Sequence, residues 1–92
     1  MAVAVKIPLA LRPATGGESA VSVEGQTVDE VLEALFTRFG ELRERIADES
    51  GALRRFVNIY VAGEDIRFLE GLHTPVPDGS EITILPAVAG GR

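Results

Sequence analysis

The chain has 92 residues, a net charge of −5 and 46% hydrophobic residues, but no cysteine. A chain of this length buries only about 60% of its unfolded surface even as a single domain. It is therefore too short to contain a second independent domain. Without cysteine, disulfides, iron–sulfur clusters, thiolate metal sites and a cysteine nucleophile are excluded as well. The acidic balance argues against nucleic acid and membrane surfaces and favours a basic protein partner.

The chain begins with an alternation of apolar and other residues that predicts a half-buried strand over residues 3–11. Pro8 cannot donate a ladder hydrogen bond, so we expect an irregularity there. Lys6 and Arg12 interrupt and close the apolar stretch, which argues against a signal peptide. No run approaches the roughly 20 apolar residues of a membrane span, so we expect a soluble, cytoplasmic protein.

Paired glycines in TGGES, residues 15–19, predict a turn, and AVSVEG, residues 20–25, alternates like a second strand, which completes a hairpin. Gly16 and Gly17 lack the Lys-Ser/Thr of a phosphate-binding loop. We therefore interpret them as turn residues only.

An amphipathic helix follows the hairpin. Thr27 can cap its start, and Glu30 can return a hydrogen bond to the Thr27 N–H. The apolar stripe follows helical spacing and consists of Val28, Val31, Leu32, Leu35, Phe36 and Phe39. Gly40 is placed to end this helix in the left-handed conformation, and residues 41–55 predict a short helical turn and a polar loop.

The last third of the chain predicts further strands. Residues 56–61 alternate, with Val57, Ile59 and Val61 on one face and the residues between them on the other. Residues 66–69 can form a short companion strand, and residues 71–79 are typical of a loop. The final strand, EITIL at 81–85, turns Ile82 and Ile84 inward.

This order of elements predicts an α+β domain of the β-grasp type, the ubiquitin architecture, over residues 1–85. We expect a mixed four- to five-stranded sheet packed on one main helix. The first and last strands are expected side by side and parallel at the centre, joined by a right-handed crossover. Residues 86–92 are expected to form a flexible tail ending Gly-Gly-Arg.

The chain is a poor candidate for an enzyme, with no catalytic residue and no metal site expected. The single histidine, His73, has no serine or cysteine motif beside it. The acidic pairs suit structural roles better than catalysis or magnesium binding, because one belongs to the first turn of a helix and the others to turns. These pairs are Asp29 with Glu30, Asp48 with Glu49, and Glu64 with Asp65.

The tail is the remaining candidate site. Pro86 is expected to end ladder pairing, and the residues after it have small side chains. Extended, the tail could reach up to roughly 20 Å, enough to thread into a neighbour's active site. Glycine lacks a Cβ, so it can pass a narrow channel. The threading residues are Pro86, Ala87, Val88, Ala89 and Gly90. The alternative is a frayed terminus without a function.

Three stretches carry a resemblance to a known family. They are LPAVAGG at 85–91, DGSEITI at 78–84 and EDIRFLEGLHTPV at 64–76. The chain thereby resembles the ubiquitin-like sulfur carriers of the MoaD/ThiS family. Two further stretches, VKIPLALRPATGG and RRFVNIYVAGEDIRF, are most similar to the CysO branch, whose carriers serve a cysteine synthase.

The resemblance implies a function for the tail. An activating enzyme adenylates the carboxylate of Gly91 with ATP and magnesium, and a sulfur donor converts it to a thiocarboxylate. In the CysO branch the thiocarboxylate attacks an aminoacrylate on a pyridoxal-phosphate cysteine synthase, and a zinc metalloprotease of the JAMM type releases cysteine. ATP, zinc and pyridoxal phosphate belong to these partners, and the carrier itself, expected to be a monomer, binds no cofactor.

Arg92 departs from this pattern, because the carboxyl of Gly91 is held in a peptide bond. Arg92 is interpreted as an extension that a protease removes, with an added residue or an inert tail as the alternatives. The other functions left open are the small subunit of molybdopterin synthase, a ubiquitin-like protein modifier and a non-covalent binding module. Phe56, Tyr60 and Leu85 are expected to form an apolar docking face on the open side of the sheet.

Overall fold

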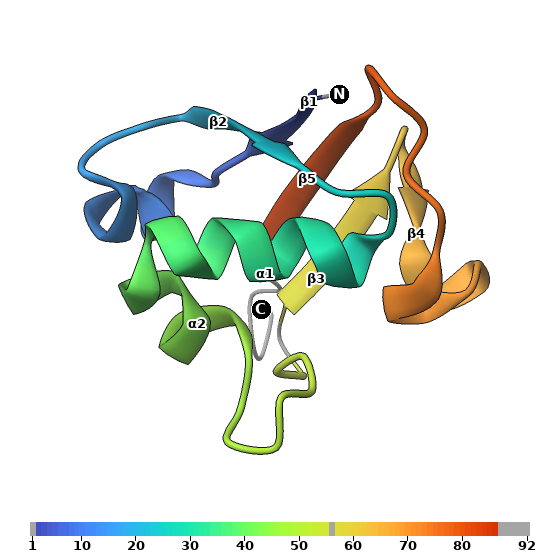
Figure 1. Ribbon diagram of the computed structural model, residues 1–92. Coiled ribbons are helices and arrows are strands. Elements are labelled where there is room, and N and C mark those ends of the chain that lie inside the picture. Colours follow the sequence, from blue (N-terminus) through green and yellow to red (C-terminus); the bar gives the residue numbers. More distant parts are fainter. Residues whose placement is uncertain (1, 56, 87–92) are drawn as a thin grey trace.

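The computed structural model describes residues 2–55 and 57–86, and it has two layers (Figure 1). One layer is a five-stranded sheet of order β2-β1-β5-β3-β4. The strands are β1 (Ala2–Lys6), β2 (Ala20–Glu24), β3 (Val57–Val61), β4 (Glu64–Asp65) and β5 (Glu81–Pro86). The helices α1 (Val28–Arg38) and α2 (Gly40–Ile46) form the other layer. The expected α+β fold, a mixed sheet with one main helix, is confirmed.

Strands β1 and β5 are parallel neighbours at the centre of the sheet, as expected. Val5 pairs with Ile82, and both side chains are fully buried. Strand β2 pairs antiparallel with the outer side of β1, while β3 pairs antiparallel with the outer side of β5. The inward residues of β3 predicted from the alternation, Val57, Ile59 and Val61, are all buried.

Helix α1 buries the stripe that its spacing predicts, except that Phe39 follows the helix and is only partly buried. The Thr27 hydroxyl accepts the Glu30 N–H at 3.3 Å, so Thr27 is the cap. The Glu30 carboxylate accepts the Gln26 N–H at 2.9 Å. The Glu30 side chain therefore accepts its hydrogen bond from Gln26, the residue before the cap, and not from the expected Thr27 N–H.

The expected strand over residues 3–11 is wrong beyond Lys6. A 3-10 helix, η1 (Leu9–Thr15), follows, because the Pro8 carbonyl accepts the Leu11 N–H at 2.9 Å and turns the chain. Leu11 and Ala14 are buried by this turn, whereas Leu9 is 75% exposed. The irregularity expected at Pro8 is therefore a change of element.

Two other local predictions are wrong. Gly40 does not end α1 in the left-handed conformation, since α1 ends at Arg38, its C-cap is Phe39 with φ −131°, and Gly40 begins α2. Residues 66–69 form no strand, because the Asp65 carboxylate accepts the Arg67 N–H at 2.8 Å and starts the 3-10 helix η2 (Ile66–Phe68). The loop after it contains another 3-10 helix, η3 (Gly71–His73).

Substitution Thr27→Ala should lower the free energy of unfolding by about 1 kcal/mol, because it removes the cap of α1. Thr37→Ala is the matched control: its hydroxyl donates to the Glu33 carbonyl inside the same helix, so no terminal N–H loses a partner. Urea denaturation measures both. Equal losses in the two variants would contradict the capping role.

Gly25 makes a close approach to α1, since a Cβ there would lie 2.7 Å from the backbone nitrogen of Val31. Gly25→Ala should therefore cost about 1–3 kcal/mol of unfolding free energy. A Cβ at Gly40 would meet open space, so Gly40→Ala should be neutral or stabilising by up to about 1 kcal/mol. Thermal denaturation of the pair tests this contrast, and a Gly25→Ala variant as stable as Gly40→Ala would refute it.

Candidate functional site

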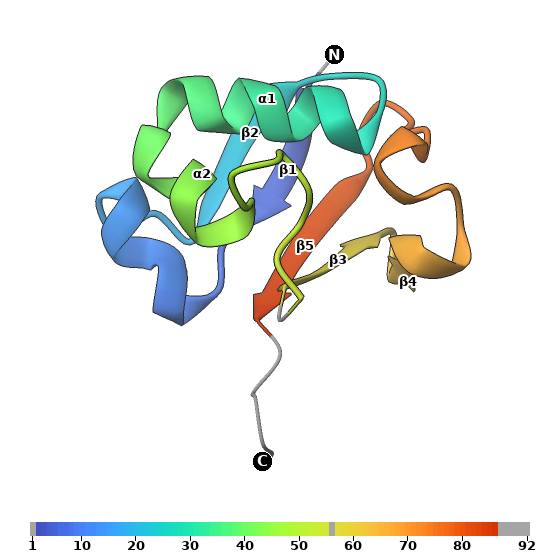
Figure 2. The same ribbon diagram turned by 90° about the horizontal axis from the view of Figure 1, so that it is seen from below.

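The predicted reactive residue, Gly91, lies outside the described residues, together with Ala87, Val88, Ala89, Gly90 and Arg92. The structure instead shows how the segment before them is held. Strand β5 lies between β1 and β3 and runs to the lower edge of the domain in Figure 2. It continues through Pro86, which is the register partner of Val57, so ladder pairing extends one residue beyond the expected end.

The inner face of β5 anchors it to the core. Ile82 and Ile84 are both fully buried, and Ile84 pairs with the buried Ile59 of β3. Burying a side chain of this size contributes about 1.5–3 kcal/mol. The attachment point of the tail is therefore fixed within the most buried part of the sheet.

The opposite face of the sheet carries two of the three residues expected to form a docking surface. Leu85 pairs with Asn58, and Tyr60 pairs with Thr83, so Leu85 and Tyr60 are diagonal neighbours. Leu85 is 44% exposed and Tyr60 is partly buried. The third expected residue, Phe56, lies outside the described residues. The docking face of Phe56, Tyr60 and Leu85 stays a prediction, and Tyr60 and Leu85 are the two of its residues that the structure describes.

A shallow hollow beside Leu85 brings two basic side chains close to the end of β5. Lys6, Arg12, Thr83 and Leu85 are among the residues that line it. The Lys6 ammonium lies 3.7 Å from the Glu81 carboxylate, and the Arg12 Nε donates to the Ile7 carbonyl at 3.2 Å. The placement of Arg12 depends on η1, so the predicted long strand could not reveal it.

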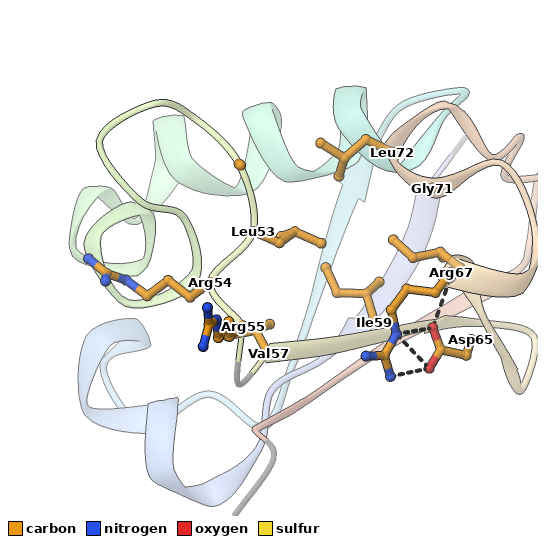
Figure 3. A pocket seen from close by; sticks show the side chains of 11 residues that line it. Leu53, Arg54, Arg55, Val57, Ile59, Asp65, Arg67, Gly71 and Leu72 are labelled. Atoms are coloured by element: carbon orange, nitrogen blue, oxygen red, sulfur yellow. Dashed lines mark hydrogen bonds and ion pairs between the residues drawn. The ribbon is translucent and has the colours of Figure 1, made fainter. Parts of the chain in front are cut away.

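A second cavity, of about 400 Å³, opens on the helical side of the sheet next to β3 (Figure 3). Its apolar lining includes Leu53, Val57, Ile59, Ile66 and Leu72, and its polar lining consists of Arg54, Arg55, Arg67 and Asp65. We call it the arginine-rimmed cavity. Three separate segments contribute to it, and the sequence analysis did not identify it.

Arg67 and Asp65 form an ion pair at one side of this cavity. The Arg67 Nη2 lies 2.7 Å from the Asp65 Oδ2, and the Arg67 Nε donates to both carboxylate oxygens at 3.2 Å. The side-chain hydrogen bonds, with that from the Arg67 N–H, lower the pKa of Asp65, and the side-chain bonds and the charge of Asp65 raise the pKa of Arg67. Asp65 is therefore engaged in a structural ion pair.

Residues of the other acidic pairs also have structural positions. Asp48 accepts hydrogen bonds from the Ser50 hydroxyl at 2.6 Å and from the Ala52 N–H at 3.1 Å, which organise its loop. Asp29 and Glu30 occupy the first turn of α1. His73 is exposed at the end of η3. Within residues 2–55 and 57–86, no three His, Asp or Glu side chains are grouped so that they could hold a metal ion.

No helix in the described part of the chain is both long enough and apolar enough to cross a membrane.

Residues 5–91 match the ThiS family. The chain is 52% identical to the sulfur carrier protein CysO of Mycobacterium tuberculosis over 93 aligned positions, which cover 99% of this chain and all of that protein. Its structure is similar to a chain in the crystal structure of the Amycolatopsis orientalis BexX/CysO complex, with a TM-score of 0.89, 47% identity and coverage of 97% and 99% of the two chains.

A third similarity is to the solution structure of the small archaeal modifier protein 1 from Methanosarcina acetivorans, with a TM-score of 0.85 and 38% identity. That match covers 98% of this chain and 96% of the other. The family match over nearly the whole chain, the identity to CysO and the shared fold agree with one another. The chain belongs to the ThiS family.

Proposed function

We propose that the chain is a sulfur carrier that delivers sulfur as a thiocarboxylate on Gly91. The observation that carries this proposal is the 52% identity to the sulfur carrier protein CysO over 99% of the chain. Sulfur carriers of the ThiS and CysO type are carriers rather than enzymes, which confirms the prediction that this chain is not itself an enzyme.

The proposed chemistry takes place on the Gly91 carboxylate. A carboxylate oxygen attacks the α-phosphorus of ATP, pyrophosphate leaves, and an acyl adenylate forms. Sulfur at the sulfide level, HS−, then attacks the carbonyl carbon, the bond from that carbon to the phosphate oxygen breaks and AMP leaves, and loss of the S–H proton gives the thiocarboxylate. ATP and magnesium are held by the activating enzyme, and the role of the carrier is to present the carbonyl.

The pathway we favour is cysteine biosynthesis. A pyridoxal-phosphate synthase would accept the thiocarboxylate, and a zinc metalloprotease would release the product from the carrier. The supporting observation is the similarity to CysO, which in the Amycolatopsis structure is in complex with another protein, BexX. A carrier that visits several enzymes needs a common docking surface, and Tyr60 and Leu85 lie on the sheet face beside the end of β5.

Arg92 must be removed before this cycle can begin, because only a free Gly91 carboxylate can be adenylated. A chain produced without Arg92 should become heavier by the difference between sulfur and oxygen when incubated with ATP, its activating enzyme and a sulfur donor. The full-length chain should stay unchanged unless it first loses one arginine. Intact-mass spectrometry measures both. An unmodified chain without Arg92 would contradict the proposal.

A protein modifier is the second candidate, supported by the 38% identity to a small archaeal modifier protein. It would use the same adenylate but transfer Gly91 to a lysine amine. Isopeptide-linked Gly91 adducts on lysine residues in the same incubation, in place of the thiocarboxylate, would favour this function. Lys6 is the one lysine of the chain itself.

Leu85→Glu should raise the KM of the activating enzyme for the carrier about tenfold or more, because it places a charge in the proposed docking face. Leu9→Glu is the matched control, since Leu9 is 75% exposed on η1 and is not part of that face. Steady-state release of pyrophosphate measures KM for both. The docking role fails if the two variants show the same KM.

A further inference from the structure

The arginine-rimmed cavity is the least expected feature of the surface. It lies where α1 does not cover β3, between the loop over residues 52–55 and the turns around η2 and η3 (Figure 3). Leu53 and Leu72 are only partly buried, although both pack against the core. Its volume of about 400 Å³ is within the range of small-ligand pockets and can accept one or two side chains.

The charge of the cavity is opposite to that of the chain. Its lining has three arginines and one aspartate, a net charge of +2, while the whole chain carries −5. Arg67 is neutralised by Asp65, so the positive charge lies on the side of Arg54 and Arg55. An apolar floor with this rim is complementary to an apolar group that has a carboxylate next to it.

The two arginines differ in how they lie. Figure 3 shows the Arg54 side chain pointing away from the cavity, and its Nε donates to the Glu44 carbonyl of α2 at 2.8 Å. Hydrogen bonds from Ser50 and Ala52 are the main causes that lower the pKa of the nearby Asp48, and the charge of Arg54 adds to them. Arg55 is exposed and makes no hydrogen bond or ion pair with any other described residue.

The cavity adjoins the base of the tail. Val57 lines the cavity and is also the register partner of Pro86, the last residue of β5. Arg54 and Arg55 lie just before Val57 in the sequence. A protein that grips the tail where it leaves β5 therefore has the cavity beside it, on the side of the sheet opposite Tyr60 and Leu85.

We propose that the arginine-rimmed cavity anchors an acidic, apolar-tipped segment of the protein that receives the tail. An apolar side chain enters among Leu53, Ile59 and Leu72, and a neighbouring carboxylate accepts hydrogen bonds from Arg55. The identity of that protein rests on the proposed function, whereas the recognition chemistry rests on the cavity alone. This contact, made in addition to the contact with the tail, fixes the orientation of the folded domain while the tail is inserted.

The cavity is tested without any enzyme by titrating the full-length, ¹⁵N-labelled chain with the blocked peptide Ac-Glu-Asp-Leu-Asp-Glu-NH2. The amide signals of Leu53, Ile59 and Leu72 should shift, with saturation at millimolar peptide, up to about 10 mM. Peptides with Ser for Leu, or with Gln and Asn for the acids, should lose most of this effect. Equal binding of the neutral peptide, or no shift at these residues, overturns the proposal.

The partner is tested by kinetics with the chain lacking Arg92. The variant Arg55→Glu should raise the KM of the activating enzyme for the carrier about tenfold with kcat unchanged, and this difference should shrink in high salt. Arg38→Glu on α1, which contacts β2 at the opposite edge of the sheet, changes the net charge by the same amount as Arg55→Glu, so it is the charge-matched control and should change KM less than about twofold. Equal KM values in the two variants overturn the anchor while leaving the sulfur-carrier proposal intact. If the unsubstituted chain is not adenylated at all, the proposed function is refuted. The peptide titration then still tests whether the cavity binds an acidic, apolar-tipped segment.

Discussion

The parallel pairing of β1 with β5 is the constraint on which the rest of the structure depends. The pairing brings residues 4–6 next to residues 81–83. Most of the sequence therefore lies in the connection between these two strands. Helix α1 buries its stripe on the sheet built around this pair. The segment before the predicted reactive residue is thereby placed at the centre of the fold, although it is last in the sequence.

Elements whose residues repeat with a regular period could be predicted from the sequence. The two-residue period located β2, β3 and β5 with their inward faces, and the spacing from Val28 to Phe36 located α1. The two errors in predicted strands arose where one local hydrogen bond decides the backbone. The Pro8 carbonyl and the Asp65 carboxylate each accept a bond that starts a 3-10 helix, and the apolar residues after them are equally compatible with a strand.

The two parts of the candidate site differ in how far the sequence reveals them. The residues of the tail motif are consecutive in the sequence, so the motif could be recognised from the sequence alone. The arginine-rimmed cavity is assembled from residues 52–55, 57, 59, 65–67, 71 and 72, and nothing in the spacing of these residues predicts that they meet. The net charge favoured a basic partner, because a total of −5 contains no information on where an arginine such as Arg55 lies.

The central position of β5 also has a mechanical consequence. In the proposed function, an enzyme that draws the tail into a channel pulls along the axis of this strand, and the ladder bonds to β1 and β3 run across it. Such a pull loads both ladders in shear, so hydrogen bonds on both sides of β5 share the force, whereas an edge strand would have a single ladder to resist it. The central position of β5 therefore favours resistance to a force applied through the tail.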